Sequence, residues 1–264
     1  MISALSAAVS FTSCSLFSID NYEGPEESLC GAVTDRSGNP VLTDQGTEGI
    51  RVRLTETSWT SGKVTPIDFY AMPDGCYRNT KIFEGTYNVR VDGPFVPIVV
   101  EDAIGNVLED NSVTLEIKGE KTVDFQVDPF LNVEIVGVSV SNGKVIAKIK
   151  VNRGISREDL RNRLKRTDDY EDSYADVTDV QLFVGYSSSM GYRNRDARWS
   201  SSLNFSGDSF DDKLGKTVTI ESSGSVPSGR KVFVRAAARI NYDTPRGSGI
   251  RRWNYSSIEE IIVP

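Results

Sequence analysis

The chain has 264 residues, of which 38% are hydrophobic and 25% charged, so it is long enough for two domains with buried cores. It contains no histidine, which removes the usual catalytic base and the commonest metal ligand. Residues 1–128 contain 9 Lys and Arg against 20 Asp and Glu, a net −11, and residues 129–264 contain 21 against 17, a net +4. Neither half has the basic stripe that nucleic-acid binding requires, so we expect no nucleic-acid partner.

The chain begins with an uncharged, mostly small or apolar run, residues 2–13, that ends at Cys14. About a dozen residues are too few for a bilayer span, which takes about 20, but fit the roughly 7–15 residues of a signal-peptide core. We therefore expect residues 1–13 to be a lipoprotein signal peptide and Cys14 to be the lipidated residue. The run lacks a basic start, because Arg36 is the first Lys or Arg, so a hydrophobic first strand or a disordered start is the alternative.

Residues 14–28 form a polar, acidic segment that includes Gly24 and Pro25. This composition is typical of a flexible tether between an anchor and a folded body. No other apolar run approaches membrane-spanning length, so we expect membrane attachment through the lipid anchor only.

Short strands separated by turn sequences are predicted throughout residues 29–128. In residues 50–55 and 87–92, apolar side chains alternate with polar ones, the period of an antiparallel strand with one buried face. The expected strands are 29–35, 49–57, 67–72, 86–93, 96–102, 113–119 and 121–127. Strands of this length and spacing predict a β-sandwich.

Residues 129–264 show the same style, after a boundary that we expect at Asp128-Pro129 because proline interrupts sheet pairing. Residues 131–152 predict two strands joined by a hairpin at Asn142-Gly143. One short helix is expected within 156–167, where Ser156 can cap the first turn. The other expected strands are 177–187, one around 200–205, 216–222, 230–242 and 254–263. The fold class is therefore all-β, with two consecutive antiparallel sandwiches and one helix in the second.

No motif for catalysis or phosphate binding is found. Serine–histidine and cysteine–histidine pairs are excluded by the absence of histidine, and the glycine-rich stretches lack the context of a phosphate-binding loop. The three cysteines lie too far apart for a zinc site. Cys30 and Cys76 could form a disulfide in an oxidising compartment or remain free thiols. We expect no catalytic residue and no enzyme.

Two acidic segments, 168–179 and 208–212, were the remaining candidates for chemistry. Clustered carboxylates can bind calcium, and paired carboxylates can hydrolyse glycosides. Neither segment has the spacing of an EF-hand, and acidic loops are usually solvated surface. We expect no cofactor and no metal site, with calcium at these loops as the alternative.

Aromatic residues in polar loops are the better candidates for binding. A sugar presents an apolar C–H face to an aromatic ring, while Asp, Asn and Arg bind its hydroxyls. The candidate glycan contacts are Trp59, Tyr170, Tyr174, Tyr192 and Trp199. The competing interpretation is that each of these rings packs in a core, since tryptophan is highly buried on average.

Several stretches together resemble a known family. They are "DNYEGP" at 20–25, the pair Asp74-Gly75, the run 79–87 with "FEGTY", the tripeptide at 93–95 and the closing segment 232–264. On these motifs the chain resembles the Bacteroidetes lipoprotein family called domain of unknown function 3823 (DUF3823). The resemblance implies a transthyretin or carboxypeptidase-regulatory-like sandwich over residues 29–128. It implies a fibronectin-type-III or immunoglobulin-like sandwich over residues 129–264.

The resemblance also implies a function, because the family usually occurs beside outer-membrane porins and glycan-capturing lipoproteins of starch-utilisation type. No catalytic residues are known for the family. We therefore expect a non-enzymatic lipoprotein, anchored in the outer membrane and facing the cell surface. It would bind or present a polysaccharide or oligosaccharide for uptake, with the porin and the glycan-capturing lipoprotein as partners. The alternative is a structural subunit that docks on the transporter without contacting glycan.

Overall fold

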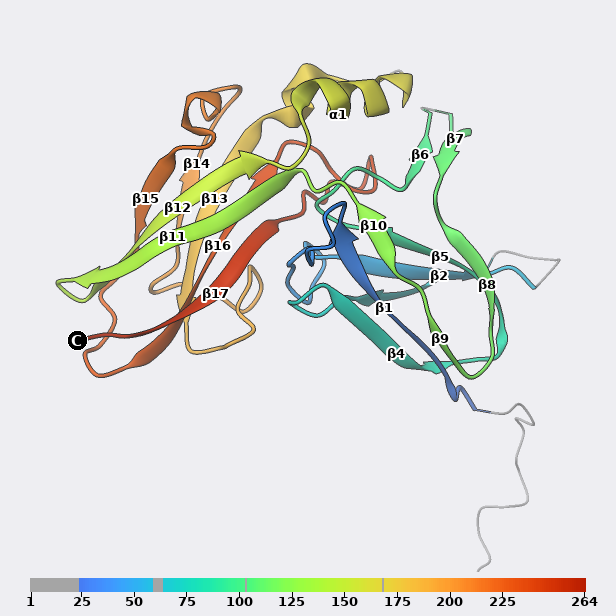
Figure 1. Cartoon of the computed structure of the whole chain (residues 1–264), viewed down its shortest axis with the longest axis horizontal. Helices are drawn as coiled ribbons and strands as arrows, with labels where there is room; N and C mark the ends of the chain where they lie inside the picture. The colour runs from blue at the N-terminus through green and yellow to red at the C-terminus, as the bar shows by residue number, and fades with distance from the viewer. Residues whose placement is uncertain (1–23, 59–63, 103, 168) are drawn as a thin grey trace, which may run out of the picture.

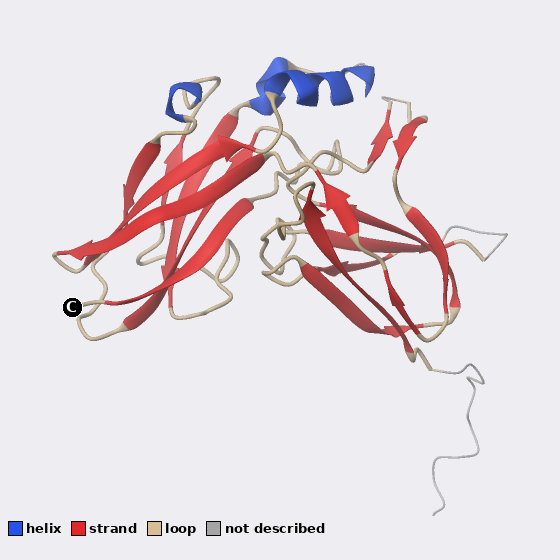
Figure 2. Cartoon of the chain, in the orientation of Figure 1, coloured by secondary structure: helices blue, strands red, loops and turns tan. Residues whose placement is uncertain are grey.

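The computed structural model describes residues 24–58, 64–102, 104–167 and 169–264, and it contains two β-sandwiches that lie side by side (Figure 1). Strands dominate both sandwiches, and the α-helix lies at one end of the second (Figure 2). The expected signal peptide, Cys14 and Trp59 lie outside the described residues. Within the described residues, no helix is both long and apolar enough to cross a membrane.

The first sandwich packs two sheets face to face, with the strand orders β10-β1-β4 and β3-β2-β5-β8. Its strands are β1 Glu27–Asp35, β2 Arg51–Glu56, β3 Ile67–Tyr70, β4 Cys76–Ile82, β5 Gly85–Asp92, β6 Val99–Glu101, β7 Val107–Asp110, β8 Val113–Ile117, β9 Glu120–Thr122 and β10 Phe125–Val127. The strands β6 and β7 form a separate two-stranded ribbon. The pairing is antiparallel as predicted, except that β9 and β10 run parallel to β1.

The buried face of β2 is the one predicted from the alternation of apolar and polar residues. Val52 and Leu54 are fully buried, while Arg51 and Arg53 point to the outer face of the sheet. The strand β4 was not predicted, because its sequence CYRNTKI is mostly polar and buries only Tyr77 and Ile82. The short strand β7 was also missed, and the predicted strand 121–127 is divided into β9 and β10.

The second sandwich pairs a sheet of order β11-β12-β15 with one of order β14-β13-β16-β17. Its elements are β11 Leu131–Ser141, β12 Lys144–Arg153, α1 Arg157–Leu164, β13 Val177–Gly185, β14 Ser201–Asn204, β15 Thr217–Glu221, β16 Lys231–Ile240 and β17 Asn254–Ile262. Three short 3-10 helices, Lys165–Thr167, Asp172–Ala175 and Asp211–Lys213, complete it. The hairpin prediction is confirmed, because Asn142 and Gly143 both adopt the positive φ of a tight β-turn.

The predicted helix is confirmed as α1. The Ser156 hydroxyl accepts a hydrogen bond from the backbone N–H of Asp159, and Leu160 and Leu164 bury one face. The two cysteines of the first sandwich are free thiols. They lie on the neighbouring strands β1 and β4, where Cys30 is opposite Arg78 and the Cys30 thiol contacts the Thr122 hydroxyl.

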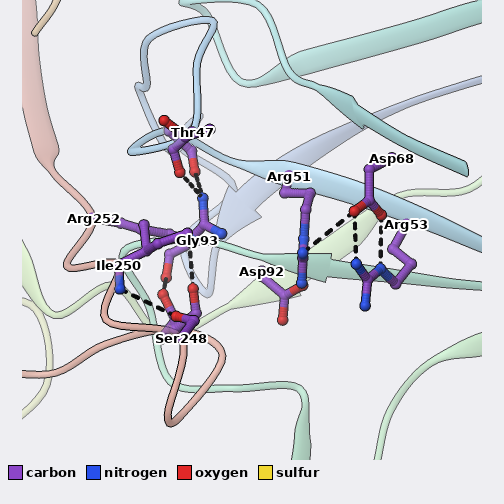
Figure 3. Close-up of polar contacts among 11 residues, drawn as sticks. Thr47, Arg51, Arg53, Asp68, Asp92, Gly93, Ser248, Ile250 and Arg252 are labelled. Atoms are coloured by element: carbon purple, nitrogen blue, oxygen red, sulfur yellow. Dashed lines mark hydrogen bonds and ion pairs between the residues drawn. The ribbon is translucent and has the colours of Figure 1, made fainter. Parts of the chain in front are cut away.

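Two buried arginines of the second sandwich bind backbone carbonyls of the first. Arg252 donates to the carbonyl oxygens of Thr47 and Gly49, as well as to Thr244 within its own half (Figure 3). Arg235, on β16, donates to the carbonyl of Pro73 at 3.3 Å. Both side chains are almost completely buried. A main-chain carbonyl is a fixed acceptor, so these bonds hold the two halves in one orientation.

Candidate functional site

A hollow of the second sandwich lies where α1 meets the loops that carry the two acidic segments. Its volume is about 530 Å³, within the range of about 300–1,000 Å³ that small-molecule sites occupy. We call it the Tyr170 pocket. Its lining residues are Arg157, Arg161, Tyr170, Asp172, Ser173, Asp176, Gly207, Asp208 and Asp211.

Helix α1 supplies the two guanidinium groups of the Tyr170 pocket. Arg157 and Arg161 are four residues apart, so they lie on one face of the helix. Arg157 bridges Asp176 at 2.6 Å and Asp211 at 2.9 Å, and thereby ties two loops to the helix. The pair between Arg161 and Asp172 is more than half exposed, so its groups remain accessible to a ligand.

The Tyr170 ring is half-buried at the side of this pocket. It meets the ring of Tyr174 edge to face, with the centroids 5.8 Å apart. Burial, together with the charge of Asp172, raises the pKa of the Tyr170 hydroxyl, although Arg161 opposes the shift. The hydroxyl is therefore protonated at neutral pH and can both donate and accept a hydrogen bond.

Tyr174 supports Tyr170 and does not line the pocket. Its side chain is 8% exposed and packs against Tyr242, and the guanidinium of Arg246 lies 4.5 Å from its ring centre. Its hydroxyl accepts a hydrogen bond from the same arginine. Of the predicted glycan contacts, the structure therefore brings Tyr170 and Tyr174 together, one at the pocket and one beneath it.

The other two predicted glycan contacts within the described residues, Trp199 and Tyr192, have rings that neighbouring side chains cover. Trp199 is 4% exposed and belongs to the core of the second sandwich, where Tyr186 packs against it. Tyr192 stacks on the buried Trp253 at 5.6 Å, and the guanidinium of Arg195 lies over its ring. For these two residues the structure favours the competing interpretation, in which the ring packs against the protein, and their contact with glycan stays a prediction.

The two acidic segments do meet, but arginines lie between their carboxylates. Asp176 and Asp211 share Arg157, and Asp211 also pairs with Arg153 at 3.0 Å. No group of three or more acidic or cysteine side chains is placed to hold a metal ion within the described part of the chain. The arrangement suits hydrogen bonding to hydroxyl groups better than it suits a divalent cation.

Sequence reasoning missed Arg157 and Arg161, although a signal was present. Arginines spaced four residues apart on a capped helix, followed by an acidic loop, predict ion pairs across that helix face. The contribution of Asp211 could not have been inferred, since it lies 54 residues from Arg157.

Comparisons with known proteins agree with this architecture. The family model described as the protein of unknown function (DUF3823) N-terminal domain matches residues 27–128. A solved DUF3823 family protein from Bacteroides uniformis is 57% identical, with 91% of this chain and 100% of that chain covered and a TM-score of 0.88. No curated protein matches the chain.

Two more distant solved structures share the fold. One is a DUF3823 family protein from Parabacteroides merdae, 16% identical, with 90% of this chain and 100% of that chain covered and a TM-score of 0.58. The other is named a "putative carbohydrate binding protein" from Bacteroides uniformis. It is 20% identical, with 91% of this chain and 100% of that chain covered and a TM-score of 0.63. At these identities the likeness establishes the fold alone.

Proposed function

The chain belongs to the DUF3823 family, and from that premise we propose that it is a non-enzymatic surface protein that binds glycan through the Tyr170 pocket. One observation carries the proposal. A half-buried aromatic ring lies in the same open hollow as two guanidiniums and four carboxylates. A sugar can place its C–H face on such a ring while its hydroxyls bind the charged groups around it.

The distant structural neighbour from Bacteroides uniformis supports this proposal by its name and its shared fold. The role that we propose for the protein is that of an accessory in a polysaccharide uptake system. An outer-membrane porin and a glycan-capturing lipoprotein would be its partners. Three of the four carboxylates already form ion pairs with Arg157 or Arg161. In this proposal the carboxylates accept hydrogen bonds from the sugar hydroxyls.

Affinity electrophoresis of the protein against a panel of plant and host polysaccharides tests the proposal. Retardation by one polysaccharide, abolished by Tyr170→Ala, is the expected result. Tyr186→Ala is the matched control, because this exposed tyrosine does not line the pocket. Retardation that Tyr170→Ala leaves unchanged would remove the pocket from the account, and no retardation by any polysaccharide would contradict glycan binding.

We also propose that the protein is anchored through a lipid on Cys14 in the outer membrane, facing the cell surface. Radiolabelled palmitate should be incorporated into the wild type and not into Cys14→Ala. Cys30→Ala is the control that should keep the label, because Cys30 lies in β1 of the folded body. Label that persists in Cys14→Ala would contradict this anchoring.

A docking role without glycan contact is the second candidate function. It is favoured by the ribbon β6–β7, where the side chains of Ile104 and Val107 are 86% and 56% exposed. It is also favoured by the burial of Trp199 and Trp253. If docking is the function, the porin should copurify with the wild type from solubilised membranes. An Ile104→Ser, Val107→Ser double variant should then lose it, and copurification that the variant retains would count against this surface.

A further inference from the structure

A second hollow lies between the two sandwiches and is separate from the Tyr170 pocket. Its volume is about 360 Å³, again within the range of small-molecule sites, and the contact zone between two domains is a common place for such sites. We call it the junction pocket. The first half contributes Arg90, Val99 and Glu101, and the second half contributes Asp169, Pro245 and Arg246.

Three arginines and two aspartates lie together on the paired strands of the sheet that borders this pocket. Arg53 pairs with Asp68 at 2.6 Å, and Arg51 bridges Asp68 and Asp92 (Figure 3). Arg90, on β5, is the third guanidinium on this face and lies directly opposite Arg53 in the strand register. Like charges on paired residues repel each other. Arg51 and Arg53 each pair with a carboxylate, whereas Arg90 forms no ion pair with the described residues.

The Arg90 guanidinium has an unsatisfied hydrogen-bond donor. Its Nε is shielded from solvent and has no partner among the described residues. Burial opposes the lowered pKa of Asp68, which Arg53 mainly causes, and Ser112 mainly lowers the pKa of Asp110. The charge of Arg90 adds a smaller effect to both. Because Nε is shielded, a ligand in the pocket would bind the terminal nitrogens of Arg90, which form no ion pair with the described residues.

The other charged groups of the junction pocket already have ion-pair or hydrogen-bond partners, with one exception. Arg246 pairs with Asp169 and with Asp243, each at 3.0 Å. Asp102 accepts the side-chain amide and the backbone N–H of Asn106 in its own turn. Glu101 is the exception, since it is exposed and its carboxylate can accept a hydrogen bond from a ligand hydroxyl.

We propose that the junction pocket binds the carboxylate-bearing sugar of an acidic glycan. Arg90 donates to the sugar carboxylate, Glu101 accepts from a ring hydroxyl, and Val99 and Pro245 contact the apolar face of the ring. A uronic acid carries all three features on a single ring. This site is separate from the Tyr170 pocket. Either pocket can prove not to bind its ligand without affecting the proposal for the other.

The test is isothermal titration of the protein with trimers of galacturonate, glucuronate and mannuronate, each as the free acid and as the methyl ester. The ester keeps the shape of the sugar and removes its charge. At least one free acid should bind, and its ester should bind about tenfold more weakly or worse, the loss expected for a hydrogen bond to a charged group. Equal binding of acid and ester, or no binding of any acid, would overturn the proposal.

Variants locate the site. Arg90→Ala should weaken the acid about tenfold without changing the melting temperature, because Arg90 has no ion-pair partner to lose within the described structure. Arg90→Lys should recover part of the affinity. Arg78→Ala, on the opposite sheet, and Tyr170→Ala should both bind the acid like the wild type. If Tyr170→Ala abolishes acid binding and Arg90→Ala does not, the acid binds in the Tyr170 pocket and the junction proposal is wrong.

Discussion

The guanidinium of Arg252, just before β17, donates to the carbonyl oxygen of Thr47 in the other sandwich at 2.6 Å, although the two residues are 205 positions apart. Burial lowers the pKa of Arg252 to about 10, so the side chain is still charged at neutral pH. Within the described residues this buried cation binds backbone carbonyls of both halves, which makes the relative position of the halves part of the folded state (Figure 3).

Arg252→Met should therefore destabilise the protein by roughly 2–5 kcal/mol, because the carbonyl oxygens that it serves are left buried without donors. Urea unfolding followed by tryptophan fluorescence measures the change. The control is Arg78→Ala, whose exposed pair with Glu120 should be worth only about 0–1 kcal/mol. A loss for Arg252→Met no larger than that of the control would show that the contacts across the junction contribute little.

Gly191→Ala tests how closely the two halves approach. A Cβ at this position would lie 2.3 Å from the Cβ of Asp44, which belongs to the other sandwich. Because an atom so near the backbone cannot move cheaply, we expect a loss of about 1–3 kcal/mol in thermal or urea unfolding. Gly137→Ala, where nothing lies within 4 Å, should be close to neutral, and equal effects of the two variants would contradict the packing described here.

Much of the fold can be predicted from local sequence patterns, but the site cannot. Alternation in β2 and the Asn142-Gly143 turn predict their structures because the interactions involved are local or between adjacent strands. The strand β4 escaped prediction because an exposed edge strand needs few apolar residues. The Tyr170 pocket joins segments around residues 157, 172 and 211, and no local pattern records which loops the sandwich brings together.

The aromatic residues illustrate the same limit. Trp199 and Tyr170 occur in similarly polar stretches, but only Tyr170 reaches a hollow. Trp199 is buried in the core of its sandwich, and the exposed Tyr186 packs against it. The polarity of neighbouring residues therefore does not predict the exposure of a ring, because the neighbours along a loop are not its neighbours in space.

The pH dependence of stability should carry a contribution from Asp44. Its carboxyl is 3% exposed, and burial raises its pKa above 3.8, although the Tyr255 hydroxyl, the Arg193 N–H and the charge of Arg235 oppose the shift. A raised pKa in the folded state means that the folded protein binds the proton more tightly than the unfolded chain. The free energy of unfolding contributed by Asp44 therefore falls as the pH rises from about 4 through the folded pKa.

Asp44→Asn removes this contribution, so its stability relative to the wild type should increase as the pH rises from 4 and then become constant. Urea unfolding of both proteins between pH 4 and 7 measures the difference. Carboxyls such as Asp128, whose pKa is lowered by Arg36, stabilise the protein less as the pH falls. Their contribution is the same in both proteins, so it cancels in the comparison. A variant that becomes relatively less stable with rising pH would show that the buried carboxylate is favourable.

Arg161→Ala separates binding from stability in the Tyr170 pocket. Its pair with Asp172 is more than half exposed, so the loss of stability should be no larger than that of Arg78→Ala. The affinity for the retained glycan should fall about tenfold, because a charged hydrogen-bond donor is lost from the site. Calorimetry of binding and of unfolding on the same sample measures both. Unchanged affinity would limit Arg161 to a structural role.

A crystal structure of the protein with the oligosaccharide unit of the retained polysaccharide would show whether the Tyr170 pocket binds glycan. We predict a sugar ring against the face of Tyr170, with its hydroxyls within hydrogen-bond distance of the groups on α1 and of Asp172. An oligosaccharide bound elsewhere on the protein, with the Tyr170 pocket left to solvent, would contradict the claim.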